Sequence, residues 1–97
     1  MKVLVIEDDA QTASFVAEGL TRSGHTADCA GTGPEGLQLA MDGSYDALIV
    51  DRMLPGLDGV AIVKALRGAG INTPALFLTA LDGVADRVLG LDAGGDD

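Results

Sequence analysis

Short apolar runs alternate along the chain with longer segments that carry apolar residues at helical spacing. The runs contain Val, Ile and Leu without polar alternation, which is typical of strands buried on both faces of a parallel sheet. The segments between them have the periodicity of helices that pack on such a sheet. The pattern predicts strands at Lys2–Ile6, His25–Ala30, Asp46–Val50 and Pro74–Leu78, and helices at Ala10–Ser23, Pro34–Met41, Gly59–Arg67 and Asp82–Asp92.

Residues with capping chemistry mark the ends of the first two predicted helices. Asp9 precedes the first helix and Gly24 follows it. Pro34 stands in the first turn of the second helix, and Gly43 comes after its end. The residues predicted to share one face of the first helix are Phe15, Val16, Gly19 and Leu20.

Strands that alternate with helices over short connections predict an α/β domain, in which helices flank a parallel sheet. The chain has 97 residues, which is one domain at most. Aromatic residues make up only 3% of the sequence, so we expect an aliphatic core. The lone Cys29 falls in the second strand, where we expect it to be a small buried hydrophobe.

The charge of the chain is strongly acidic. Six Lys and Arg residues stand against fifteen Asp and Glu residues, and the formal net charge is −9. This balance argues against direct binding of nucleic acid or of an anionic membrane surface by this segment. No stretch reaches the length of a membrane span, and no signal peptide precedes the first strand, so we expect a cytoplasmic location.

Acidic and hydroxyl side chains follow directly after three of the predicted strands. Glu7 and Asp8 come after the first strand, Asp51 after the third and Thr79 after the fourth. If the first and third strands are neighbours, as in the flavodoxin-like order 2-1-3-4, Asp8 and Asp51 face each other at the edge where such sheets bind ligands. Carboxylates that meet there repel each other, and Mg²⁺, which prefers oxygen ligands, would remove the repulsion.

This arrangement also suits chemistry on phosphorus. A carboxylate such as Asp51 is a possible nucleophile that forms an aspartyl phosphate. A metal ion would screen the incoming phosphoryl group from the surrounding acids, and the Thr79 hydroxyl would donate a hydrogen bond to a phosphoryl oxygen.

Each of these residues has a simpler interpretation when it is taken alone. Glu7, Asp8 and Asp9 together are compatible with a solvated turn and a helix cap. Asp51 is compatible with an acid that starts a loop, and Thr79 with a cap or loop residue. Only their combination at matched strand ends favours a site.

A rival motif lies between the second strand and the second helix. Residues 31–36 fit the pattern G-x-G-x-x-G, and Asp51 lies twenty residues beyond Gly31, as in dinucleotide-binding folds. However, the preceding strand is polar, the acids after the first strand stay unexplained, and the chain is short for a dinucleotide domain. We therefore favour a tight turn and a helix cap for these glycines.

Four segments resemble response-regulator receiver domains of two-component signalling: Lys2–Asp9, Asp51–Gly59, Pro74–Ala80 and Gly90–Asp97. The resemblance covers the whole chain and is closest to the OmpR-type winged-helix regulators. It implies a flavodoxin-like (CheY-like) doubly wound parallel sheet in the order 2-1-3-4. It also implies a module that switches a DNA-binding output domain when it is phosphorylated.

The resemblance also implies roles for individual residues. Asp51 would accept the phosphoryl group from a sensor histidine kinase, and Thr79 would be the hydroxyl that senses it. Asp8 and Asp51 would bind Mg²⁺ through their side chains, Met53 through its backbone carbonyl and Glu7 mainly through water.

The sequence departs from the family pattern at its end. Family receivers continue into a fifth strand and a fifth helix with a lysine followed by proline, whereas this chain stops at Asp97. We therefore expect residues 1–97 to be an incomplete receiver domain without its output domain. The fourth strand would be an exposed edge, which predicts a homodimer or an oligomer with exchanged elements.

Two other functions remain open at this point. One is a Mg²⁺-dependent phosphohydrolase with an aspartyl nucleophile, although such enzymes commonly carry an acid two residues later, where this chain has Met53. The other is a receiver-like module that does not respond to phosphate and serves only in association. In the signalling interpretation the chain is not an enzyme, apart from promoting its own phosphorylation and dephosphorylation.

Overall fold

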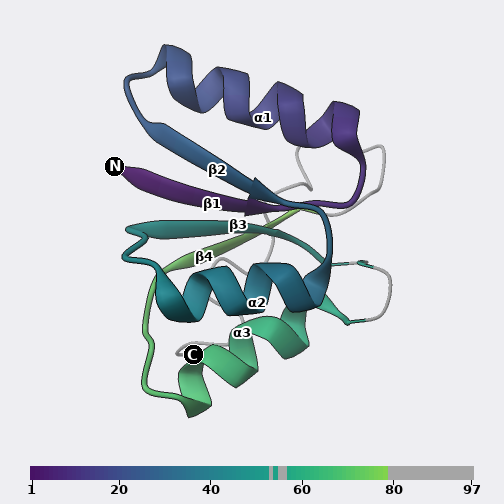
Figure 1. The fold of residues 1–97 in the computed structure, drawn as a ribbon, viewed down its shortest axis with the longest axis vertical. Coiled ribbons are helices and arrows are strands. Elements are labelled where there is room, and N and C mark those ends of the chain that lie inside the picture. Colours follow the sequence, from purple (N-terminus) through teal and green to yellow (C-terminus); the bar gives the residue numbers. More distant parts are fainter. Residues whose placement is uncertain (53, 55–56, 79–97) are drawn as a thin grey trace.

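The computed structural model describes residues 1–52, 54 and 57–78, which form a parallel sheet between two helical layers. The four strands lie in the order β2-β1-β3-β4, as the flavodoxin-like fold predicts. Figure 1 shows α1 on one face of the sheet, and α2 and α3 on the other. The strands are β1 (Lys2–Ile6), β2 (Thr26–Ala30), β3 (Ala47–Asp51) and β4 (Ala75–Leu78), and the helices are α1 (Ala10–Arg22), α2 (Gly33–Asp42) and α3 (Gly59–Gly68).

The predicted elements are confirmed to within one or two residues, with one exception. The helix predicted at Asp82–Asp92 lies outside the described residues. Asp9 caps α1 as expected, since its carboxylate accepts a hydrogen bond from the Thr12 amide at 2.9 Å. Gly24 follows that helix with a φ of +90°, a conformation that glycine adopts without steric cost.

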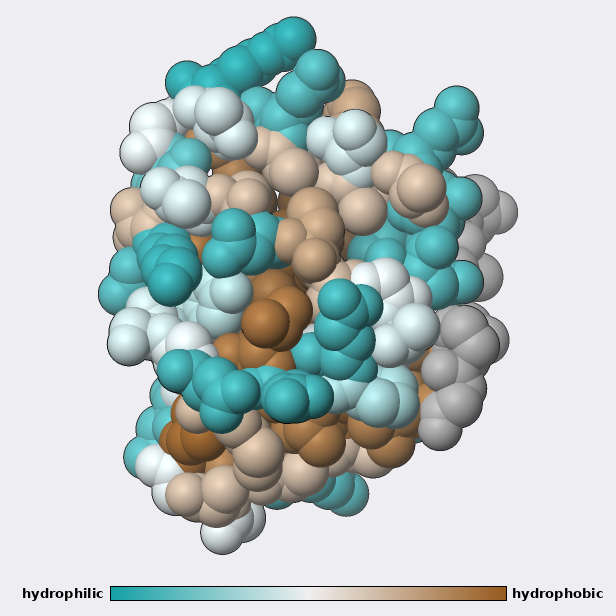
Figure 2. All heavy atoms as spheres, viewed as in Figure 1, coloured by the Kyte–Doolittle hydropathy of each residue, from teal (hydrophilic) through white to brown (hydrophobic). Residues whose placement is uncertain are grey.

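The main hydrophobic core lies between the sheet and the α2–α3 layer. It is almost entirely aliphatic, as the composition predicts, and among the described positions Phe77 is its one fully buried aromatic residue, with Tyr45 packed against it. Figure 2 shows apolar residues, in brown, gathered over α2 and α3. The side chains that β1, β3, β4 and α3 bury completely or almost completely in this core are Leu4, Ile6, Leu48, Val50, Phe77, Ile62, Val63 and Leu66.

The other face of β1 is also buried, beneath α1. Val3 and Val5 are 1% and 0% exposed, so β1 has no solvent-facing side after Lys2. Burial on both faces explains why the sequence of this strand shows no polar alternation. A strand fixed in this way gives a firm position to the residues that follow it.

The four residues predicted to share one face of α1 line one common surface of the helix: Phe15, Val16, Gly19 and Leu20. The Phe15 ring is 78% exposed, whereas Ala13 is the residue that the helix buries. Val16 and Leu20 are only half-buried. The small side chain of Ala13 lets the helix backbone approach the sheet, and Phe15 lies two residues further round the helix and away from it.

The prediction that Cys29 is buried is wrong. Cys29 is exposed on the edge strand β2, while its neighbour Ala30 points into the core. Cys29 lines a cleft of about 380 Å³ together with Ala13 and Ala17 of α1. Among the described residues, the small side chains that line this cleft leave the thiol exposed.

No helix within the described part of the chain is long and apolar enough to cross a membrane.

Two glycine substitutions should have opposite effects on stability. A methyl group on Gly36 would lie 2.6 Å from Ile6 carbons, so Gly36→Ala should lower the free energy of unfolding by about 1–3 kcal/mol. A Cβ added at Gly19 in α1 would meet no side chain or other segment of the described structure within 4 Å, so Gly19→Ala should raise the free energy of unfolding by roughly 0.5–1 kcal/mol. Urea denaturation of both variants measures the difference. Equal effects would contradict the packing described for α2.

Candidate functional site

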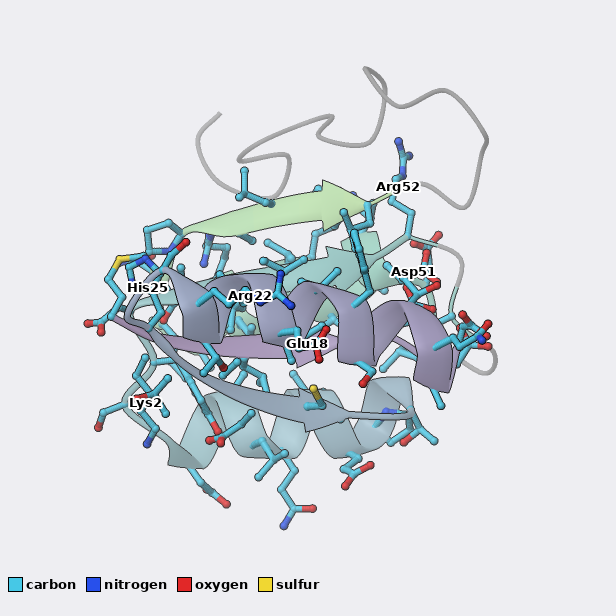
Figure 3. The ribbon with its side chains drawn as sticks, turned by 90° about the horizontal axis from the view of Figure 1, so that it is seen from above. Lys2, Glu18, Arg22, His25, Asp51 and Arg52 are labelled. Carbon is cyan, nitrogen blue, oxygen red and sulfur yellow. The ribbon has the colours of Figure 1, made fainter. Side chains whose placement is uncertain are left out.

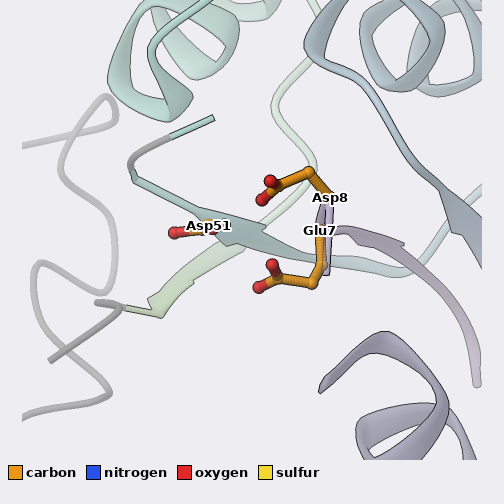
Figure 4. Close-up of side chains that lie close together, drawn as sticks. All are labelled: Glu7, Asp8 and Asp51. Carbon is orange, nitrogen blue, oxygen red and sulfur yellow. The ribbon is translucent and has the colours of Figure 1, made fainter. Parts of the chain in front are cut away.

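Three carboxylates meet at the edge of the sheet where β1 and β3 end. Glu7, Asp8 and Asp51 each place a carboxylate oxygen within 4.8 Å of the others. Figure 4 shows the three side chains side by side at the ends of these strands. β1 and β3 pair in parallel with Ile6 opposite Val50, so the residues that follow Ile6 emerge beside Asp51. The predicted convergence of these three side chains is confirmed.

The three carboxylates differ in their exposure. Glu7 and Asp51 are 7% and 4% exposed, while Asp8 is open to solvent. Asp8 also lines the cleft between α1 and β2. The cluster therefore has a buried floor and an exposed rim, which lets a small ion or ligand reach it.

Glu7 is the carboxylate whose protonation the site changes most. Its pKa is raised from 4.5 to about 7, chiefly because the side chain is buried, and the negative charge of Asp51 acts in the same direction. One hydrogen bond acts against this shift: the Asp9 amide donates to Glu7 Oε2 at 2.9 Å. The raised pKa shows that the site disfavours a third negative charge.

Figure 3 shows where three basic side chains lie relative to this cluster. Arg52 follows Asp51 in the chain, but its side chain is exposed and points away from the Asp51 carboxylate. Lys2 and His25 lie at the opposite end of the sheet. At an effective dielectric constant of about 20, each pair of ionised carboxylates about 5 Å apart repels by roughly 3 kcal/mol. A bound divalent cation would remove this repulsion.

Two hydrogen bonds fix the backbone directly after Asp51. Arg52 N donates to the carbonyl oxygen of Leu78 at 3.0 Å, which extends the pairing of β3 with β4. Gly59 N donates to the carbonyl oxygen of Arg52 at 3.2 Å and closes the loop that follows Asp51. A Cβ on Gly59 would overlap the carbonyl oxygen of Asp51, so only glycine lets α3 begin this close to it.

The glycines of the G-x-G-x-x-G pattern serve packing and capping, as we favoured. Thr32 caps α2 by accepting a hydrogen bond from the Glu35 amide at 3.2 Å, and Glu35 Oε1 accepts one from Gly31 N at 3.2 Å. Gly33 lies against Leu57, and Gly36 lies against Ile6. The strand before this motif, β2, is at the edge of the four-stranded sheet, whereas a dinucleotide fingerprint follows a central strand.

Two of the predicted site residues, Met53 and Thr79, lie outside the described residues, so their roles stay predictions. The contact between Gly33 and Leu57 is a feature of the site that the sequence did not reveal. The only sequence signal for it was a glycine in the first turn of a helix, and that signal does not name its partner.

The fold and the acidic cluster together define a class of protein, the single-domain α/β modules that present carboxylates at the switch point of a flavodoxin-like sheet. The model of the response regulator receiver domain family matches residues 3–97. The chain therefore belongs to the response regulator receiver domain family.

Curated relatives are OmpR-type transcription regulators. The chain is 46% identical over 96 residues to the transcriptional regulatory protein PcoR of Escherichia coli, and these residues are 99% of this chain and 42% of the relative. It is 45% identical over 97 residues to CusR of Escherichia coli strain K12, which covers all of this chain and 43% of CusR. The chain thus spans less than half the length of these relatives.

Solved structures show the same fold. The receiver domain of the Francisella response regulator 1452 matches with a TM-score of 0.82 and 40% identity, over 99% of this chain and 79% of that chain. The chemotaxis response regulator CheY4 of Vibrio cholerae matches with a TM-score of 0.78 and 30% identity, over 88% of this chain and 72% of that chain. These findings favour a phosphorylation-controlled signalling switch over a phosphohydrolase.

The raised pKa of Glu7 predicts how stability changes with pH in metal-free protein. A carboxyl whose pKa is about 7 when folded and 4.5 when unfolded contributes its full stability below pH 4.5 and loses it as the pH rises through 7. The free energy of unfolding should therefore fall by about 1–3 kcal/mol over this range. Urea denaturation with a chelator present measures the change.

Glu7→Gln is the matched control, because its side chain stays neutral at every pH. It should remove most of the pH dependence between pH 4.5 and 7. Asp9, whose pKa is lowered by hydrogen bonds from Thr12, loses its contribution only at lower pH and does not interfere. A wild-type stability that rises over this pH range would contradict the assignment to Glu7.

Proposed function

We propose that this domain accepts a phosphoryl group on Asp51 from a sensor histidine kinase in a Mg²⁺-dependent reaction. The observation that carries the proposal is the cluster of Glu7, Asp8 and Asp51 at the junction of β1 and β3 in a chain of the receiver family. Phosphorylation then changes the conformation of the domain and controls an output domain. In this role the chain is a signalling switch and not an enzyme that turns over a substrate.

The donor atoms at the site fit Mg²⁺. They are carboxylate oxygens, which are the ligands this ion prefers, and an exposed rim leaves room for the water molecules that it retains. In our proposal Asp8 and Asp51 hold the ion through their side chains, Glu7 acts mainly through water, and Met53 adds its backbone carbonyl. When bound, the ion neutralises negative charge on the acids and on the phosphoryl oxygens.

The transfer itself needs one nucleophile and one leaving group. An Asp51 carboxylate oxygen forms a bond to phosphorus while the bond from phosphorus to the donor nitrogen of phosphohistidine breaks, and the electron pair of that bond leaves with the imidazole. Burial of Asp51 and its fixed backbone hold the oxygen in one position for this attack. The Thr79 hydroxyl would then donate a hydrogen bond to a phosphoryl oxygen and so sense the new group.

We also propose that residues 1–97 are the receiver part of a longer transcription regulator with a separate DNA-binding output domain. The relatives named as transcription regulators, of which the chain spans 42% and 43%, support this. A cytoplasmic location belongs to the same proposal, because a regulator of transcription acts where the DNA is. A homodimer or an oligomer with exchanged elements remains part of it, and the exposed Phe15 ring is an apolar surface that supports association.

Acetyl phosphate and Mg²⁺ test the phosphoacceptor directly. We expect the wild-type chain to gain one phosphoryl group by intact mass and to retain it for minutes, because a switch holds its signal. Asp51→Asn should gain none, since an amide is not a competent nucleophile. Asp42→Asn, which changes an exposed acid at the end of α2, is the matched control and should behave as wild type. Labelling that persists in Asp51→Asn would contradict the assignment.

Mg²⁺ should also stabilise the fold by binding only the native state. At saturating Mg²⁺ and constant ionic strength, we expect the free energy of unfolding to rise by about 1–3 kcal/mol. Asp51→Asn should stabilise the metal-free form, because it removes one of the repelling charges, and should reduce the effect of Mg²⁺. Thermal denaturation with NaCl as the ionic-strength control measures both changes. A melting temperature that Mg²⁺ leaves unchanged would refute the cation site.

A further inference from the structure

The first turn of α2 lies against the loop that follows Asp51. Gly33 is buried there, and a Cβ at this position would lie 2.7 Å from Leu57 Cβ, 3.1 Å from the Leu57 carbonyl oxygen and 3.4 Å from Leu57 Cδ2. The van der Waals energy of two non-bonded carbon atoms is lowest when they are about 3.5–4.0 Å apart. A side chain at position 33 would therefore displace Leu57. The absence of a side chain at Gly33 therefore creates the space in which Leu57 packs.

The backbone around Gly33 has little freedom to move away. Thr32 and Glu35 cap the helix on either side of it, and Gly36 N donates to the carbonyl oxygen of Thr32 at 2.9 Å. One turn further on, Gly36 packs directly on Ile6, the last residue of β1. A clash at position 33 must therefore be relieved on the side of Leu57.

Leu57 belongs to a loop whose two ends are joined. It precedes Asp58, which caps α3 by accepting a hydrogen bond from Val60 N at 2.8 Å. The next residue, Gly59, donates its amide proton to the carbonyl oxygen of Arg52, directly after Asp51. A displacement of Leu57 is therefore transmitted through this closure to the backbone that presents Asp51.

We propose that Gly33 is a positioning residue for Asp51 that acts through Leu57. Gly33 lies on a different element from all three acids and touches none of the reacting atoms. Its lack of a side chain sets the position of Leu57, and Leu57 sets the position of Asp58 and Gly59, whose hydrogen bond to Arg52 steadies the end of β3 at Asp51. This inference rests on the proposed function of Asp51 as phosphoacceptor, but the contact itself can be tested without it.

Gly33→Ala is the first variant. We expect its rate of phosphorylation by acetyl phosphate at saturating Mg²⁺ to fall on the order of tenfold, and its affinity for Mg²⁺ to fall as well, because small misplacements of reacting groups cost large factors in rate. Leu66→Ala controls for lost stability, since Leu66 is fully buried near the other end of α3. At temperatures where both variants are folded, the control should keep the wild-type rate within about twofold.

A double-mutant cycle tests whether Leu57 carries the effect. Leu57→Gly removes the two side-chain carbons that a methyl group at position 33 would meet. In that background, the further change Gly33→Ala should alter the rate and the Mg²⁺ affinity by less than about twofold. The same loss in both backgrounds would overturn the proposal, and so would a Gly33→Ala variant with wild-type rate and affinity.

Amide NMR signals separate this inference from the proposed function. The signals of Asp51 and Arg52 should shift in Gly33→Ala and stay in place in Leu66→Ala, whether or not the chain accepts phosphate. Suppose that the wild-type chain takes no phosphoryl group, but the NMR shifts and the double-mutant cycle measured by Mg²⁺ affinity come out as expected. The proposed function is then wrong and the positioning role of Gly33 stands. Unshifted signals would overturn the positioning role alone. If Gly33→Ala does not fold, Leu57→Ala must shift the same signals for the proposal to survive.

Discussion

The parallel pairing of β1 with β3 forces like charges together, and the rest of the site depends on this constraint. Because Ile6 pairs with Val50, Glu7 and Asp8 lie beside Asp51. The hydrophobic burial of both strands holds this register against the repulsion of the carboxylates. The molecule thus uses the stability of its core to hold an arrangement of charges that is unfavourable until a cation or a proton arrives.

The scaffold around the acids relies on close backbone contacts more than on side-chain bonds. Gly36 brings α2 onto the end of β1, Gly33 makes space for Leu57, and Gly59 lets α3 begin beside Asp51. Each of these glycines lacks a Cβ at a point where two segments of the site meet. These contacts matter for the proposed function, because a carboxylate must hold its position to attack phosphorus.

The sequence predicted most of the fold because local and long-range signals agreed. Unbroken apolar runs marked the strands, and Asp9, Gly24 and Pro34 marked helix ends by local chemistry that needs no tertiary information. The convergence of the three acids followed from the strand order. What the sequence could not predict depended on packing between distant segments. Cys29 is exposed because β2 lies at the edge of the sheet beside small side chains of α1, and a pattern along one element does not contain that information.

The central claim is that the carboxylates of Asp8 and Asp51 share one divalent cation. The most direct measurement is a crystal structure of the chain with Mn²⁺, which replaces Mg²⁺ at oxygen sites and is located by its anomalous scattering. We predict a single anomalous peak at coordination distance from a carboxylate oxygen of Asp8 and of Asp51. Glu7 should contact this ion mainly through water. Density that shows these carboxylates turned apart with no ion between them would contradict the claim.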